Sequence, residues 1–328
     1  MKRTVVTAVL LASLLITCSK DSPAPVTPIP PLYNWSPQPS GSSANLYDVF
    51  FTNSSQGWVV GELLTLLATS NGGVAWPQVP SSSVVRDLTS VVFVDSQNGW
   101  MTGGSDANPI DGYVFVSRTG GSYPTQQEMV DHPLNTVFFL NKNTGWAGGD
   151  SSILIHTING GVDWSETAIG TKNRIHDLQF LTSEMGWAAT NPGGIYRTKD
   201  GITWTKEDLG TVTDVRAIHF LDTLHGWACG AENTLLRREL DSNNKPVWIK
   251  SSIPSESGLT EWRDIFFVGQ QKGWVVGSFG NVYTTGDGGV TWTKQSAGSS
   301  EDLNAIYMVS NSSGWIVGDN GAILTFTP

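Results

Sequence analysis

GWVVGSFGNVYTTGDGGVTW, residues 273–292, contains the three elements that decide the fold of this chain. A Gly-Trp pair opens an apolar run, a run of Val, Tyr and Thr follows, and an Asp-Gly-Gly turn leads to a second tryptophan. β-Branched and aromatic residues favour strands, and Gly supplies the positive φ that a tight hairpin turn needs. The stretch therefore predicts two short strands, a turn, and a third short strand that carries Trp292.

The Gly-Trp pair is one mark of a repeat. It occurs seven times, at gaps of 40 to 47 residues, with the tryptophans Trp58, Trp100, Trp146, Trp187, Trp227, Trp274 and Trp315. An apolar six-residue run precedes each pair, as Leu46, Val49 and Phe51 do in the first unit. Each unit then holds four short strands, and units of this length are typical of propeller blades.

The last unit ends one strand short, and the missing strand is found at the other end of the chain. Trp35 precedes Leu46 by the spacing that outer-strand tryptophans show elsewhere, so we expect it to complete the seventh unit. Such pairing closes a ring and removes exposed sheet edges. The sequence predicts an all-β fold over residues 33–328, a seven-bladed β-propeller of four-stranded antiparallel blades whose last blade is closed by the N-terminal strand.

Tryptophan is unusually abundant, with 14 in 328 residues. Seven follow glycine on the second strand, six stand on the outer strand, and Trp262 falls in an apolar column. An indole buries a large area and fills the wide periphery of a blade. We therefore assign the tryptophans to packing and not to an aromatic binding platform.

The first 32 residues predict export. Lys2 and Arg3 precede an apolar run from Val5 to Ile16, which is short for a membrane span. Residues 1–18 resemble a bacterial lipoprotein signal with Cys18 as the lipidated residue; the alternative is an ordinary signal peptide with an incidental cysteine. Residues 19–32 hold five prolines and predict an extended tether. The expected location is the bacterial cell envelope, with a lipid anchor in the outer membrane and a periplasmic or surface-exposed domain.

Charge narrows the range of partners. The net charge is −10 and the isoelectric point is about 4.9, so nucleic acid is not expected as a partner. No group of His and Cys residues suggests a metal site, and no cofactor is expected. We expect a monomer.

Candidate binding residues lie at the mouth of the predicted channel, 11 positions before each Gly-Trp tryptophan. This column, here called the mouth column, is polar and varies between units: Tyr47, Thr89, Asn135, His176, Arg216, Arg263 and Asn304. Arg174 lies beside it in the loop before the fourth unit. Arginines suit a carboxylate, a phosphate or an acidic protein segment. The alternative is a solvated mouth whose arginines pair with Asp214, Glu261 and their neighbours.

Two other functions were weighed against protein binding. A glycoside hydrolase needs two carboxyl groups that face one sugar, and Asp177, Asp264 and Asp48 are the candidates at the mouth. The units are too closely spaced for the long insertions that build a deep cleft, so no catalytic residue is expected. A lectin would repeat one pocket in several blades, whereas the mouth column varies.

Two resemblances support these expectations. Turns such as Thr285-x-Asp287-x-Gly289-x-x-Trp292 are similar to the Asp-box of sialidase-like propellers, whose role is structural. The whole repeat, above all residues 273–292, resembles that of the photosystem II stability/assembly factor family. The resemblance implies a propeller that binds proteins or assembling complexes without catalysis. It does not carry over the photosystem partner.

Overall fold

The computed structural model describes residues 35–80, 86–105, 110–122, 124–210, 214–253 and 260–326. They fall within one compact unit, Tyr33–Pro328. The expected signal peptide, its lipidation site Cys18 and the tether at 19–32 lie outside the described residues. In the described part of the chain, no helix is long and apolar enough to span a bilayer.

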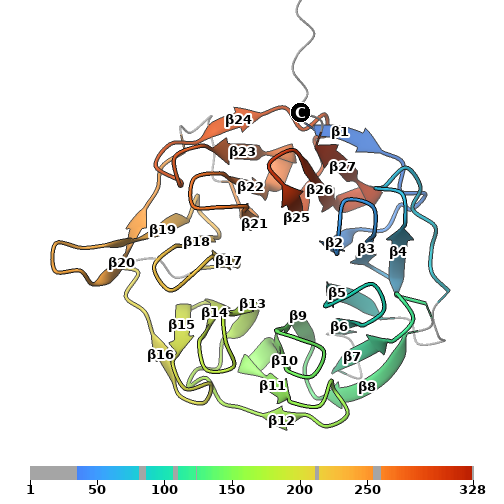
Figure 1. Cartoon of the computed structure of the whole chain (residues 1–328), viewed down its shortest axis with the longest axis horizontal. Helices are drawn as coiled ribbons and strands as arrows, with labels where there is room; N and C mark the ends of the chain where they lie inside the picture. The colour runs from blue at the N-terminus through green and yellow to red at the C-terminus, as the bar shows by residue number, and fades with distance from the viewer. Residues whose placement is uncertain are drawn as a thin grey trace, which may run out of the picture. The chain divides into compact units, whose positions relative to one another are not determined.

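Seven antiparallel sheets are arranged around a central channel, which confirms the predicted propeller (Figure 1). Each sheet is one blade, and blades one to seven are numbered along the chain. The inner strands line the channel and are β2 (Leu46–Phe51), β5 (Asp87–Phe93), β9 (Leu134–Phe139), β13 (Arg174–Phe180), β17 (Ala217–Phe220), β21 (Trp262–Phe267) and β25 (Leu303–Ser310).

The second and third strands of the blades follow in chain order. The second strands carry the Gly-Trp pairs and are β3 (Gly57–Gly61), β6 (Gly99–Ser105), β10 (Gly145–Gly149), β14 (Gly186–Asn191), β18 (Gly226–Cys229), β22 (Gly273–Gly277) and β26 (Ser313–Gly318). The third strands are β4 (Thr65–Thr69), β7 (Asp111–Ser117), β11 (Leu154–Thr157), β15 (Gly194–Thr198), β19 (Leu235–Leu240), β23 (Val282–Thr285) and β27 (Ile323–Phe326).

The outer strands vary most. They are β8 (Thr125–Val130), β12 (Ser165–Glu166), β16 (Trp204–Lys206), β20 (Pro246–Lys250), β24 (Thr293–Gln295) and, in blade seven, β1 (Trp35–Gln38). Blade one has three strands, and its outer edge is reduced to a single bridge between Leu67 and Gln78. The hairpin of β19 and β20 projects from the rim (Figure 1).

The N-terminal strand closes the ring as the sequence predicts. β1 pairs antiparallel with β27, with Trp35 opposite Phe326 and Gln38 opposite Ile323. The Trp35 indole is fully buried and donates to Gln295 Oε1 of blade six at 2.9 Å. The N-terminal strand therefore supplies the outer strand of blade seven.

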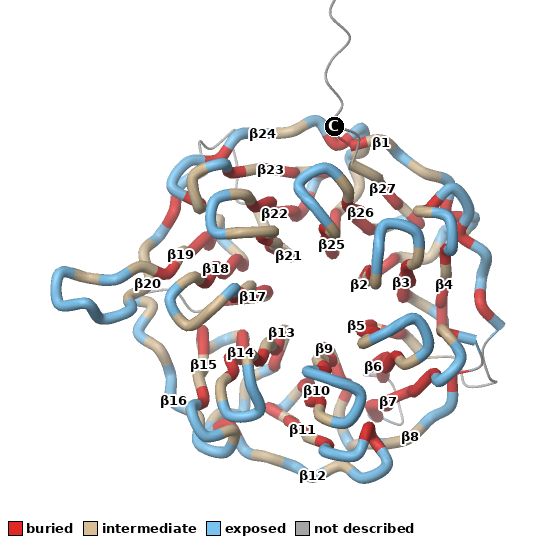
Figure 2. Tube along the Cα trace, viewed as in Figure 1, coloured by how far each residue is buried: buried red, intermediate tan, exposed pale blue. Residues whose placement is uncertain are grey.

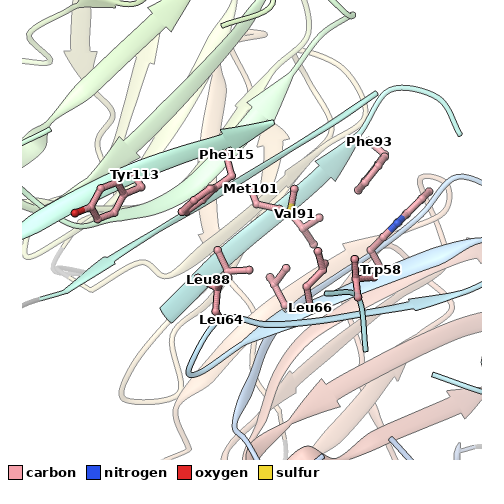
Figure 3. Close-up of a cluster of buried hydrophobic side chains, with 11 residues drawn as sticks. Trp58, Leu64, Leu66, Leu88, Val91, Phe93, Met101, Tyr113 and Phe115 are labelled. Atoms are coloured by element: carbon pink, nitrogen blue, oxygen red, sulfur yellow. The ribbon is translucent and has the colours of Figure 1, made fainter. Parts of the chain in front are cut away.

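Tryptophans of the second strands join neighbouring blades. Trp58 of blade one stacks on Phe93 of blade two with ring centroids 3.6 Å apart (Figure 3). The same Trp–Phe stack recurs at five further junctions: Trp100–Phe139, Trp146–Phe180, Trp187–Phe220, Trp227–Phe267 and Trp315–Phe51. Glycine precedes each of these tryptophans, and a Cβ at Gly57 would lie 2.5 Å from the Phe51 ring. The repeat therefore encodes the contact between blades.

The Asp-box turns complete these junctions. In blade three, the Thr157 hydroxyl accepts from Gly161 N at 2.9 Å and donates to Asn159 Oδ1 at 3.0 Å. The buried Gly160 carbonyl then accepts from the Trp100 indole of blade two at 3.1 Å. The turns are structural, in line with the resemblance. Figure 2 shows much of the inner, second and third strands buried, and much of the outer strands and connecting turns partly or fully exposed.

Candidate functional site

A β-bulge shapes the mouth of the channel, the end at which the inner strands begin. In blade one, Leu46 pairs with Gly61 and Asp48 with Val60, so Tyr47 is left unpaired. A bulge re-aims side chains, and here two successive residues, Tyr47 and Asp48, line the channel. Gly61 is required because its Cβ would lie 2.2 Å from the Asn45 carbonyl oxygen.

All seven residues of the mouth column line one cavity of about 250 Å³. The residue after each of them lines the same cavity: Asp48, Ser90, Thr136, Asp177, Ala217, Asp264 and Ala305. Arg174 lies outside it, in a second cavity that shares Tyr47, Thr89 and Asn135 with the first. The structure therefore brings the candidate residues together, and their role in binding stays a prediction.

Most of the mouth column also holds the ring together. Thr89 donates to the Leu134 carbonyl at 2.6 Å, Asn135 to the Ile175 carbonyl at 3.0 Å, and Asn304 to the Leu46 carbonyl at 2.8 Å. Each bond runs from one blade to the next. The variation in this column therefore partly reflects different side chains that make the same kind of hydrogen bond to the next blade.

The mouth arginines are already paired with carboxylates. Arg216 lies 3.1 Å from Glu261 and 3.7 Å from Asp214, while Arg263 lies 2.6 Å from Asp302 and also donates to Asn304. Arg174 pairs with Asp150 at 2.5 Å. This arrangement matches the alternative that the sequence left open, a solvated mouth whose arginines pair with neighbouring acids.

Tyr47 and His176 are the two members of the column that do not bridge blades in the described residues. Tyr47 donates to Glu62 of its own blade at 3.1 Å. Burial, with Glu62 and Asp87 nearby, raises the pKa of the Tyr47 phenol. His176 Nε2 is buried without a hydrogen-bond partner. Burial and the charge of Arg216 lower the pKa of His176 to about 4, so the ring is neutral at physiological pH.

The three candidate carboxylates join blades. Asp48 accepts from Val49 N and Val91 N, each at 2.8 Å, and from Ser90 Oγ at 2.9 Å. Asp177 accepts from Leu178 N and Ile218 N, and Asp264 from Ile265 N and Ile306 N. Burial raises the pKa of Asp48 to about 7 and of Asp177 to about 6, and raises that of Asp264 well above its usual value.

A second set of mouth residues was missed in the sequence. The turns between second and third strands place residues five positions after the Gly-Trp tryptophan in the left-handed region, with φ of 53° at Leu63 and 60° at Phe279. Their side chains are 69% and 73% exposed. Bulky residues rarely adopt such φ values. The sequence does mark these two positions, because Leu63 and Phe279 are apolar where other units have Ser, Pro, Glu or Asn.

Comparison with known proteins identifies relatives. The family model described as "Photosynthesis system II assembly factor YCF48" matches residues 78–216 and 238–327. "Photosystem II assembly lipoprotein Ycf48" from Synechococcus sp. (strain CC9902) is 23% identical over 272 residues, which cover 80% of this chain and 79% of that protein.

Solved structures share the fold. "YCF48 bound to D1 peptide" superimposes with a TM-score of 0.72 at 18% identity, over 90% of this chain and 95% of that one. The GH74 enzyme of Niastella koreensis superimposes with a TM-score of 0.69 at 13% identity, over 89% of this chain and 53% of that one. At these identities the likeness concerns the propeller alone.

Proposed function

Because the chain belongs to the Photosynthesis system II assembly factor YCF48 family, we propose that it is a non-catalytic binding protein that holds a segment of a partner protein at the mouth of its channel. The photosystem partner is not part of the proposal. A relative solved with a D1 peptide supports a protein segment as the ligand class, and a named assembly factor among the relatives supports a role in complex assembly.

One observation carries the proposal. Seven polar side chains of five chemical types converge on one cavity at one end of the ring. His176 holds unused hydrogen-bonding capacity there, because its Nε2 atom is buried without a partner in the described residues. A ligand group that reached this atom would satisfy it, and satisfying a buried polar atom is favourable.

Anchoring belongs to the same proposal. Lipidation at Cys18 and the tether at 19–32 would hold the propeller at a membrane of the cell envelope. Within the propeller, Trp35 lies at the edge of blade seven on the face opposite the mouth, because β1 runs antiparallel to β27 with Trp35 opposite Phe326.

Catalysis and glycan binding remain alternatives with less support. Each oxygen of Asp177 and Asp264 accepts a backbone N–H bond, so neither carboxylate is free to attack or protonate a sugar. An anionic ligand would have to displace Glu261 or Asp302 from the mouth arginines. A lectin propeller repeats one pocket in several blades, whereas the side chains of the mouth column vary from blade to blade.

Site-specific photo-crosslinking tests the proposal. The photoreactive amino acid p-benzoylphenylalanine is placed at Tyr47, in the mouth, in the full-length protein expressed in its own organism. The matched control is Ile202, a 73% exposed residue at the opposite end of the ring. We expect a discrete protein adduct from position 47 and none from position 202.

Two results would contradict the proposal. The first is equal adducts from both positions or none from Tyr47. The second is release of product from chromogenic glycosides by the purified protein, lost on Asp177→Asn or Asp264→Asn, which would establish the hydrolase alternative.

A further inference from the structure

We propose that the mouth sector formed by blades six, seven and one and by Asp87 of blade two receives a partner segment that carries basic and apolar side chains. This inference rests on the proposed function and names the chemistry of the partner. The sector is defined here as Leu63, Phe279, Glu62, Asp87, Glu301 and Asp319, and is called the acidic sector.

Two exposed apolar side chains provide its anchors. Phe279 and Leu63 stand on turns of blades six and one, on either side of blade seven, at the mouth end. Their backbone N–H groups donate to Asp302 Oδ1 at 2.9 Å and Asp87 Oδ1 at 3.0 Å, each in the following blade. The anchors are therefore held in place although their side chains are exposed. Rigid apolar anchors at low entropic cost are typical of binding hot spots.

The carboxylates of the sector lack cationic partners in the described chain. Glu62 accepts from Tyr47 and Asn45, Asp319 from Asn304, and Glu301 from Asn320. Asp87 caps the Leu63 N–H group. Hydrogen bonds to neutral groups leave these four negative charges uncompensated.

The rest of the mouth differs. Arg174 pairs with Asp150, Arg216 with Glu261 and Arg263 with Asp302. These ion pairs offset the charges of the three arginines of blades four to six, whereas the described residues form no ion pair with the four carboxylates of the acidic sector. Complementary charge across an interface fixes register and speeds association. Basic side chains next to apolar ones therefore fit this sector, and anionic membrane surfaces do not.

Short fluorescein-labelled peptides test the inference by fluorescence anisotropy on the full-length protein. One peptide alternates Lys with Leu, one Glu with Leu, and one Ser with Leu. We expect the Lys–Leu peptide to bind most tightly at low salt and to weaken at high salt because salt screens the carboxylates.

Variants assign the binding to the sector. Glycine readily adopts positive φ, so Leu63→Gly/Phe279→Gly keeps the fold while it removes both anchors. We expect it to bind the Lys–Leu peptide at least about tenfold more weakly. Val290→Ala, which removes an exposed apolar residue at the opposite end, should leave the affinity unchanged.

A second pair of variants tests the charge. Glu62→Gln/Asp319→Asn should weaken binding at low salt and flatten its salt dependence. Glu166→Gln, at an exposed position on β12, should do neither.

The outcomes separate this inference from the proposed function. Equal affinity for the Glu–Leu or Ser–Leu peptide, or no effect of the anchor and charge variants, overturns the acidic sector. If the Tyr47 crosslink still forms in that case, the proposed function stands and only the assigned chemistry falls. If neither peptides nor crosslinks report binding at the mouth, both fall.

Discussion

The mouth of this ring and its opposite end join neighbouring blades in opposite ways. At the end opposite the mouth, a tryptophan of a second strand stacks on the phenylalanine that ends the inner strand of the next blade, at six junctions with ring centroids 3.5–3.9 Å apart. At the mouth, Thr89, Asn135 and Asn304 each reach the next blade through a different side chain. Packing repeats because an indole fits one geometry, whereas a hydrogen bond to a carbonyl can come from many donors. Variation around a ring is therefore weak evidence of recognition until the bonds are known.

Substitution of a tryptophan that joins two blades should have the largest effect on stability. Trp58 is 1% exposed, stacks on Phe93 and donates to the Gly120 carbonyl at 3.0 Å. We expect Trp58→Ala to lower the free energy of unfolding by about 3–5 kcal/mol, because a large core side chain leaves a cavity. Guanidinium unfolding followed by far-UV circular dichroism measures it. Trp58→Phe should lower the free energy of unfolding by less than Trp58→Ala. A loss below about 1 kcal/mol for Trp58→Ala would show that these Trp–Phe stacks do not dominate stability.

The pH dependence of stability that arises from buried titratable groups should be the next largest effect. Burial raises the pKa of Asp177 from 3.8 to about 6, so its contribution to stability is full below pH 3.8 and is lost as pH rises through 6. Burial lowers the pKa of His219 from 6.5 to about 4, so its contribution is lost as pH falls over that range. Each amounts to on the order of 3 kcal/mol.

The two variants should change the pH dependence in opposite directions. Relative to Asp177→Asn, the wild type should lose stability between pH 4 and pH 7; relative to His219→Gln, it should gain. Unfolding free energies at both pH values decide this. Parallel pH profiles for wild type and variants would contradict the assigned burial of these groups.

The mouth should show the smallest effects, and they should differ between neighbours. Asn135 bridges to the Ile175 carbonyl at 3.0 Å and to Asp150 at 2.8 Å. Asn135→Ala should cost about 1–3 kcal/mol, because it leaves buried groups unpaired. His176 Nε2 makes no such bond, so His176→Ala should change stability by less than about 1 kcal/mol. Equal losses in thermal unfolding would place His176 in the structural set.

The fold was predictable because its signals repeat, and much of the site was not because its contacts join different repeats. Gly-Trp spacing predicted seven blades, and Trp35 predicted the closing strand. The mouth column was predicted to line the channel, and it does. The pairing of Arg263 with Asp302 depends on how adjacent blades are rotated, which spacing does not report. The left-handed turn at Phe279 was also missed, because an exposed aromatic in a turn has no periodic partner.

The closing contact between β1 and β27 sets the order in which this protein can be completed. The first described strand has its partner at the far end of the chain, so during synthesis its edge stays unpaired until the last blade has been made. Unpaired strand edges are prone to aggregation and proteolysis. We therefore expect the nascent chain to depend on chaperones until Trp35 pairs with Phe326. A circularly permuted gene that begins between two blades would shorten that interval.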